Sequence, residues 1–199
     1  SAPSEGTRLD RLRVLLVREG LDALLVTDPS NRRWLTGFTG SAGSLLVSAS
    51  VALLATDFRY WEQARTQAPS FALIREGDRG TAPPLQLIAG LGGRVLGFES
   101  HVLSVANHTE WSEAIAALPS SERPQLVAAP ALIEQLRLVK EPIELTAITR
   151  AAAVTDACVA HATELAQPGT TERDLAWDIQ RYAIEHGAER LAFESIVAA

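Results

Sequence analysis

Apolar residues in the first part of the chain alternate between a helical and a strand-like pattern. Residues 8–19 carry leucines three and four positions apart, which predicts a helix, and Gly20 follows where a helix end favours positive φ. Residues 21–27 form a short apolar run that stops at Asp28 and Pro29, which predicts a buried strand and then a turn. A helix followed by such a strand is typical of an α/β domain.

The same two patterns continue to residue 129. Further strands are predicted at residues 44–47, 51–55, 71–74, 95–98 and 126–129. Further helices are predicted at residues 57–67, 81–91 and 109–118. Only residues 48–50 separate the first two of these strands, so we expect a hairpin there. The expected fold of this part is α/β, with a mixed β-sheet flanked by helices.

The pattern changes near Lys140. Pro142 is suited to the first position of a helix, and apolar residues then repeat every three or four positions up to Ala166. A second amphipathic helix is expected after Thr171, with Gly187 at its end. With residues 1–6 excluded, we expect two domains, residues 7–139 and 140–199.

The last residues, 191–199, form another apolar, β-like run. The N–H and C=O groups of a strand need hydrogen-bond partners. We therefore expect a strand here, and further polypeptide that pairs with it.

Composition and charge narrow the function classes. The net charge is −6 and the 18 basic residues are spread without a run, so the electrostatic footprint of a nucleic-acid-binding protein is missing. No apolar run reaches the length of about 18 residues that spans a membrane. Cys158 is the one cysteine, which excludes an internal disulfide and favours a reducing, cytoplasmic location. We expect its thiol to be buried.

The usual catalytic motifs are missing from the sequence. It contains no zinc-peptidase HExxH, no phosphate-binding or dinucleotide-binding glycine motif and no nucleophile elbow. The four histidines show no shared ligand spacing on a helix face. His101 and His108 are expected in a loop with Glu99 and Glu110, where solvated histidines are the preferred interpretation over a metal site.

Asp57, Arg59 and Tyr60 follow a predicted strand directly and allow two interpretations. A carboxylate, a guanidinium and a phenol together could bind a small polar ligand. Alternatively, Asp57 caps the next helix and pairs with Arg59, which the residue types favour. The four tryptophans are expected to be core or interface residues.

Three sequence blocks carry a family resemblance. Residues 31–64, NRRWLTGFTGSAGSLLVSASVALLATDFRYWEQA, resemble the amino-terminal domain of the Xaa-Pro aminopeptidase, prolidase and creatinase family. Residues 136–151, LRLVKEPIELTAITRA, resemble the inter-domain segment of that family. Residues 168–198 resemble the start of its pita-bread catalytic domain and the strand that ends in SIVA. The GSAG and TDFRY forms are more similar to Xaa-Pro aminopeptidases than to creatinases.

The resemblance implies a fold and an activity. The fold would be a creatinase/prolidase amino-terminal domain, followed by the first helices and strand of a pita-bread α+β domain. The full-length protein would hydrolyse Xaa-Pro bonds in dipeptides or short peptides, using two divalent metal ions (Mn, Co or Zn). In that family two Asp, one His and two Glu bind the metals, and all would lie after Ala199. No catalytic or metal-binding residue is therefore assigned in this chain, which alone should be inactive.

The resemblance also implies partners and site residues. Phe193 and Ile196 would line an apolar slot for proline, although plain core positions are the alternative. In related enzymes this domain caps the active site of the partner subunit in a homodimer, so Trp34, Arg59 and Tyr60 would lie near the dimer or substrate entrance. The expected partners are the carboxy-terminal catalytic polypeptide, short proline-containing peptides and a second copy, and neither nucleic acid nor membrane.

Two other functions stay open from the sequence. The fold could serve as a non-catalytic peptide- or protein-binding module that lacks the metal site. The protein could instead be a family member that acts on a non-peptide amidine such as creatine, although the GSAG block argues against this.

Overall fold

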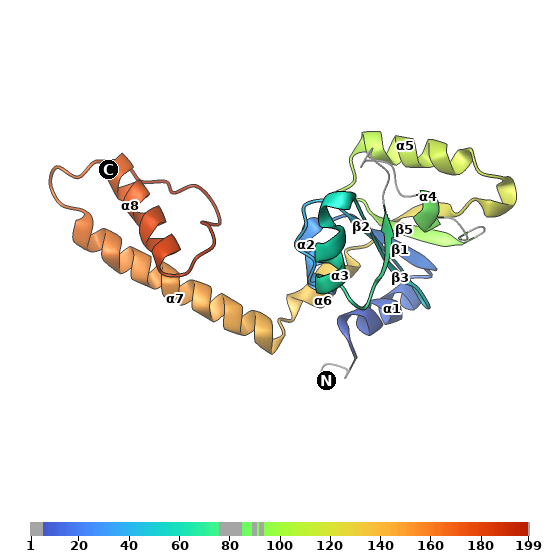
Figure 1. The fold of residues 1–199 in the computed structure, drawn as a ribbon, viewed down its shortest axis with the longest axis horizontal. Helices are drawn as coiled ribbons and strands as arrows, with labels where there is room; N and C mark the ends of the chain where they lie inside the picture. The colour runs from blue at the N-terminus through green and yellow to red at the C-terminus, as the bar shows by residue number, and fades with distance from the viewer. Residues whose placement is uncertain (1–5, 76–84, 89–90, 92–93, 199) are drawn as a thin grey trace. The chain divides into compact units, whose positions relative to one another are not determined.

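A computed structural model describes residues 6–75, 85–88, 91 and 94–198. The chain forms two compact units, Ser1–Leu138 and Val139–Ala199, which are drawn as ribbons in Figure 1. Each unit is described by itself.

The first unit is built on a mixed β-sheet, as the hydrophobic pattern predicts. Within the described residues it has six strands, β1 (Ala23–Val26), β2 (Ser44–Ser48), β3 (Ala52–Thr56), β4 (Ala72–Arg75), β5 (Val95–Glu99) and β6 (Gln125–Ala129). Their order is β4-β3-β2-β1-β5-β6. The pairs β1–β5, β5–β6 and β3–β4 are parallel, while β2 is antiparallel to both β1 and β3. All six predicted strands are confirmed, and so is the hairpin.

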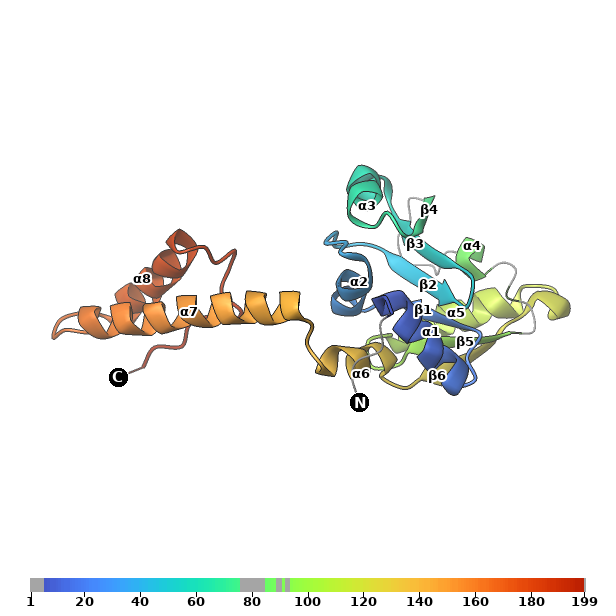
Figure 2. The ribbon, with the colours of Figure 1, turned by 90° about the horizontal axis from the view of Figure 1, so that it is seen from below.

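Helices cover both faces of this sheet (Figures 1 and 2). The first unit contains α1 (Arg8–Arg18), α2 (Pro29–Thr36), the 3-10 turn η1 (Phe58–Tyr60), α3 (Trp61–Gln67), α4 (Leu85–Ile88), α5 (Val105–Ala116), the 3-10 turn η2 (Ser120–Glu122) and α6 (Leu132–Leu138). Apolar side chains of α1, α2, α3 and α6 form one buried cluster with the sheet, and those of α4 and α5 form another.

The central strand β1 contributes to both clusters. Leu24 and Val26 belong to the cluster beneath α1 and α2, whereas Ala23 and Leu25 belong to the cluster beneath α4 and α5. This alternation follows from the two-residue period of a strand. All four residues are buried, because helices cover the two faces of the sheet.

Several local predictions need correction. The turn predicted after Asp28 is the start of α2, because the Asp28 side chain accepts a hydrogen bond from the backbone N–H of Asn31 and Pro29 takes the first helical position. α6 was not predicted. α5 begins four residues earlier than expected, because Ser104 caps it. His108 and Glu110 are therefore helical rather than in a loop. Residues 81–84 and 92–93 lie outside the described residues, and α4 covers part of the helix predicted at 81–91.

The second unit consists of α7 (Pro142–Leu165) and α8 (Glu172–Glu185), and both predicted helices are confirmed. The Thr171 side chain caps α8 by accepting a hydrogen bond from the backbone N–H of Asp174. Gly187 follows α8 with a φ of 97°, a conformation that favours glycine. Cys158 is buried, as predicted.

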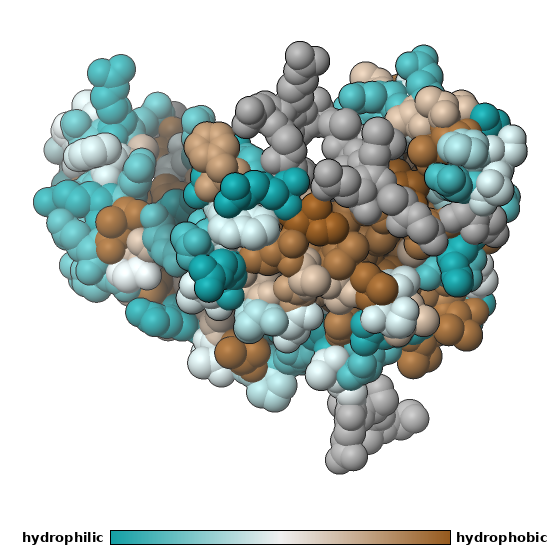
Figure 3. Space-filling model, turned by 45° about the vertical axis from the view of Figure 1, so that its right-hand side comes forward, coloured by the Kyte–Doolittle hydropathy of each residue, from teal (hydrophilic) through white to brown (hydrophobic). Residues whose placement is uncertain are grey.

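The strand predicted at residues 191–199 is wrong for the described residues 191–198, which have no regular structure. A strand needs hydrogen-bond partners along its backbone, and the described part of this unit consists of helices and turns. Large apolar side chains remain exposed in this unit, including Ile143, Leu145, Ile148, Val159, Trp177 and Ile184. On the face of the molecule drawn in Figure 3, apolar surface lies among polar surface.

Candidate functional site

Many hydrogen bonds of the first unit involve the loop between α2 and β2, residues 37–43, which we name the GSAG loop. Its backbone passes very close to other groups. A Cβ at Gly40 would lie 2.2 Å from Phe38 Cζ, and one at Gly43 would lie 2.9 Å from the carbonyl oxygen of Ala55. Both distances are shorter than side chains tolerate, so glycine is needed at both positions.

A buried arginine holds this loop from within. Arg32 on α2 is only 2% exposed. Its guanidinium donates hydrogen bonds to the carbonyl oxygens of Gly40, at 2.6 Å, and Gly43. The same guanidinium lies 5.6 Å from the ring centroid of Phe38, which is fully buried. The charge of Arg32 is thus directed at backbone carbonyls and an aromatic face.

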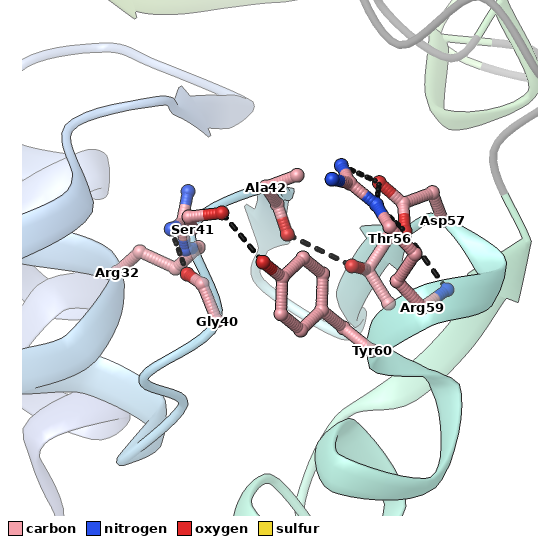
Figure 4. Close-up of polar contacts among 8 residues, drawn as sticks. All are labelled: Arg32, Gly40, Ser41, Ala42, Thr56, Asp57, Arg59 and Tyr60. Atoms are coloured by element: carbon pink, nitrogen blue, oxygen red, sulfur yellow. Dashed lines mark hydrogen bonds and ion pairs between the residues drawn. The ribbon is translucent and has the colours of Figure 1, made fainter.

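The strand β3 and the turn η1 hold the loop from the other side (Figure 4). The Thr56 hydroxyl donates a hydrogen bond of 2.8 Å to the carbonyl oxygen of Ala42. The hydroxyls of Tyr60 and Ser41 share a hydrogen bond of 2.6 Å. Two sequence blocks that read separately as LTGFTGSAG and TDFRY therefore form one continuous structure.

Asp57 caps the amino end of η1, and Arg59 lies within this turn. The Asp57 carboxylate accepts a hydrogen bond from the backbone N–H of Arg59 and lies 2.7 Å from its guanidinium. The hydrogen bond from Arg59 holds the pKa of Asp57 below its usual value. This agrees with the interpretation of Asp57 as a helix cap with an ion pair.

Two glutamines of α3 also form hydrogen bonds with the GSAG loop. The Gln67 side-chain oxygen accepts a hydrogen bond of 2.9 Å from the backbone N–H of Thr39. The Gln63 side-chain amide donates a hydrogen bond of 2.8 Å to the Thr39 hydroxyl. Thr39 and Ser41 themselves are exposed. The loop is thus a preorganised surface feature that presents small polar side chains.

A second polar group lies at the carboxyl ends of β1 and β5, and the sequence interpretation missed it. We name it the Asn31 cluster, which consists of Asn31, Glu99, Glu134 and Arg137. The Asn31 side-chain amide donates to Glu99, at 2.7 Å, and to Glu134, and its oxygen accepts a hydrogen bond of 2.7 Å from Arg137. Asn31 is fully buried.

Glu99 is the most deeply buried carboxylate of this cluster, at 5% exposed. It accepts hydrogen bonds from the backbone N–H groups of Thr27, at 2.6 Å, and Asp28, at 2.7 Å, at the amino end of α2. Burial raises the pKa of Glu99, although these hydrogen bonds oppose the shift. Glu99 is therefore not in a solvated loop, as the sequence interpretation had it. His101 Nε2 lies 3.1 Å from Glu134 Oε1.

Comparison with known protein families shows to which family the chain belongs. Residues 8–139 match the family described as the Creatinase/Prolidase N-terminal domain. The chain belongs to this family. Residues 146–199 match a second family, described as Metallopeptidase family M24. The resemblance drawn from the three sequence blocks is confirmed, as is the creatinase/prolidase type of mixed sheet.

The creatinase/prolidase chain is similar to peptidases over most of its length. It is 32% identical over 191 residues to the uncharacterized peptidase YqhT of Bacillus subtilis, which covers 96% of this chain and 52% of that protein. The solved structure of the Xaa-Pro dipeptidase from Bacillus anthracis superposes with a TM-score of 0.78 at 27% identity, covering 92% of this chain and 50% of that one. The chain thus spans about half the length of these two relatives.

A solved structure of a single domain is also similar. It is the N-terminal domain of the cytoplasmic peptidase PepQ from Mycobacterium tuberculosis H37Rv, at 39% identity and a TM-score of 0.56. The match covers 98% of that chain and 65% of this one. The creatinase/prolidase domain therefore recurs as a unit of its own in a solved structure.

The candidate site residues of the creatinase/prolidase domain differ in exposure. Arg59 and Tyr60 adjoin the GSAG loop, with the side chain of Arg59 57% exposed and Tyr60 half-buried. Trp34 is only 6% exposed, and the guanidinium of Arg8 lies 4.6 Å from its ring centroid. Trp34 therefore anchors α2 in the apolar core.

The candidate pocket residues of the second unit, Phe193 and Ile196, are 80% and 92% exposed. They follow α8 in the stretch without regular structure. Neither side chain is part of a core in the described residues of this unit.

The described residues also bear on metals and membranes. No group of three or more His, Cys, Asp or Glu side chains among them is arranged to hold a metal ion. No helix in the described part of the chain is long and apolar enough to cross a membrane.

Proposed function

We propose that the whole protein is a metal-dependent peptidase that hydrolyses Xaa-Pro bonds in dipeptides or short peptides. In this proposal residues 7–139 are the amino-terminal domain and residues 140–199 begin the pita-bread catalytic domain. The observation that carries the proposal is the match of one chain, in order, to the creatinase/prolidase domain and the M24 metallopeptidase family. The similarity to an Xaa-Pro dipeptidase over 92% of this chain supports it.

The catalytic centre of this enzyme would contain two divalent metal ions, Mn, Co or Zn, held by residues other than those described here. Such ions activate water and polarise the scissile carbonyl. Residues 1–199 alone would then be inactive, because a metallopeptidase without metal ligands has no means of generating its nucleophile.

The amino-terminal domain would act at the substrate or dimer entrance of a cytoplasmic homodimer. Arg59 and Tyr60 are exposed or half-buried beside the GSAG loop, whose backbone is held in one conformation, so this surface could select short peptides by shape. Trp34 would support it from the core. Phe193 and Ile196 would line an apolar slot for the proline ring, to which their exposed side chains are suited.

The test is turnover by the full-length protein. The full-length protein, purified with its intact mass recorded, would be assayed on a dipeptide and a tripeptide that contain an Xaa-Pro bond. Mn²⁺, Co²⁺ and Zn²⁺ would each be added after removal of metal with a chelator. We expect metal-dependent hydrolysis, and none of matched peptides with alanine in place of proline.

Residues 1–199 provide the control for the peptidase assay. Purified alone, they should show no turnover with any metal. If the full-length protein also hydrolyses neither peptide with any of the three metals, the peptidase proposal is wrong and a peptide-binding module becomes the better description. Light scattering of the same sample tests the dimer.

A further inference from the structure

The Asn31 cluster connects three parts of the first unit that are far apart in sequence. Asn31 lies on α2, Glu99 ends β5, and Glu134 and Arg137 lie on α6. Its hydrogen bonds span 68 residues from Asn31 to Glu99 and 106 residues from Asn31 to Arg137. α6 is the last element of this unit before residues 139–141, which lead into α7.

The two ends of α6 are held in different ways. Leu132 and Ile133 at its start are each 1% exposed and belong to the apolar core. Leu138 at its end is 71% exposed. The Arg137 guanidinium donates to the buried Asn31 oxygen over 2.7 Å, which ties the last turn to α2 and, through the bond from Asn31 to Glu99, to the end of β5. The first turn is thus held by two fully buried apolar side chains, and the last turn by the Arg137 hydrogen bond and the half-buried Leu136.

The chemistry of the cluster depends on the amide at position 31. Asn31 presents its N–H groups to two carboxylates and its oxygen to a guanidinium. An aspartate would have the same shape but would bring a third carboxylate against Glu99 and Glu134. Like charges at such distances repel, and buried polar groups without partners are costly.

We propose that the Asn31 cluster is a latch that holds the last turn of α6 on the sheet, and so fixes the end of the first unit from which the chain passes to the second. Leu136 is the one residue of 135–138 that packs against the apolar core, and only partly buried, so release of the latch frees these residues while the sheet stays folded. Local opening of this kind is common where polar contacts rather than apolar burial hold an element.

Hydrogen exchange of the 199-residue chain tests the latch. The variants are Asn31→Asp, which replaces the N–H donors facing Glu99 and Glu134 by a carboxylate oxygen, and Arg137→Leu, which removes the tie itself. The control is Gln135→Ala on the same helix, which loses only an exposed contact of 3.4 Å with Arg18. Peptides covering residues 130–140 would be compared with peptides covering the β2–β3 hairpin.

We expect both variants to raise amide exchange in residues 135–138 by about tenfold or more, with the hairpin unchanged, since exchange follows the population of the open form. Gln135→Ala should match the parent chain. Unchanged exchange in α6 in the folded variants would overturn the proposal. Faster exchange in α6 and the hairpin together would also overturn it, because the cluster would then belong to the global core. If Asn31→Asp does not fold, Arg137→Leu decides between these outcomes.

Discussion

Two neighbouring residues of α2, Asn31 and Arg32, are both polar and both buried, yet they stabilise different parts of the domain. Arg32 reaches carbonyl oxygens 8 and 11 residues away in the GSAG loop. Asn31 reaches side chains 68 to 106 residues away on β5 and α6. Successive residues of a helix point about 100° apart, so one short helix serves two separate networks. Substitutions at Arg32 and Asn31 can therefore test the GSAG loop and the contacts with β5 and α6 separately.

The largest effect is expected from Arg32→Met. This change leaves the carbonyl oxygens of Gly40 and Gly43 without their charged donor, and should lower the free energy of unfolding by about 3 kcal/mol. Urea denaturation measures the loss. The exposed neighbour gives a matched control, because Arg33→Met should change stability by less than about 0.5 kcal/mol. Equal losses in the two variants would contradict the role given to Arg32.

A somewhat smaller loss is expected from Gly40→Ala. The added methyl would lie 2.2 Å from the fully buried Phe38 ring, so the loop or the ring must move. Overpacking of this kind costs about 1–3 kcal/mol. Gly6→Ala is the control, because its Cβ would meet only an ordinary contact of 3.4 Å. If Gly40→Ala has the same melting temperature as the parent chain, the GSAG loop has room for the added methyl group beside the Phe38 ring.

The two networks should also differ in their response to pH. Burial raises the pKa of folded Glu99 above the usual value of 4.5, so the folded state binds the proton more tightly than the unfolded state. The stability that this provides is fully present below about pH 4.5 and is lost as pH rises through the folded pKa.

The substitution Glu99→Gln should remove this part of the pH dependence. The difference in unfolding free energy between the parent chain and the variant should shift in favour of the variant as pH rises from 4.5. Urea titrations across pH 4.5 to 7.5 measure it. The exposed Glu113→Gln provides the same change of charge as a control. A constant difference across the range would argue that Glu99 keeps its usual pKa in the fold.

The smallest effect is expected where the GSAG loop meets η1. Tyr60→Phe removes the hydrogen bond to Ser41, which lies near solvent, and should lower stability by about 0.5–1 kcal/mol. A double-mutant cycle with Ser41→Ala isolates the pair. A coupling energy near zero would mean that water replaces this bond, and that Arg32 and Thr56 hold the loop without it.

Most of the sheet could be predicted from the hydrophobic pattern. Each strand is a short apolar run between breakers, and the two helices of the second unit repeat apolar residues at helical spacing. α2 was missed because Asp28 and Pro29 mark both a turn and a helix start, and the following residues are largely polar. The strand predicted at residues 191–199 is wrong for residues 191–198 because the apolar pattern alone does not show whether a pairing strand is available.

The candidate site was predictable only in part. Asp57 and Arg59 are two residues apart, so their cap and ion pair could be anticipated from chemistry. Trp34 is buried, in agreement with the expectation of a core or interface tryptophan, although α2, which carries it, was not predicted. The sequence predicts Glu99 in a loop, because nothing near it in sequence indicates that Asn31 is its hydrogen-bond partner.

The family, the alternation of helices and strands, and the contacts that close within a few residues can all be inferred from the amino-acid sequence alone. Hydrophobic period, capping residues and glycines act locally, so they can be interpreted without knowing which segments meet. The tertiary structure decided the strand order, the burial of Asn31 and Arg32, and the joining of α6 to the ends of β1 and β5. These depend on which distant segments become neighbours, because a buried polar side chain is stable only where the fold brings its partner.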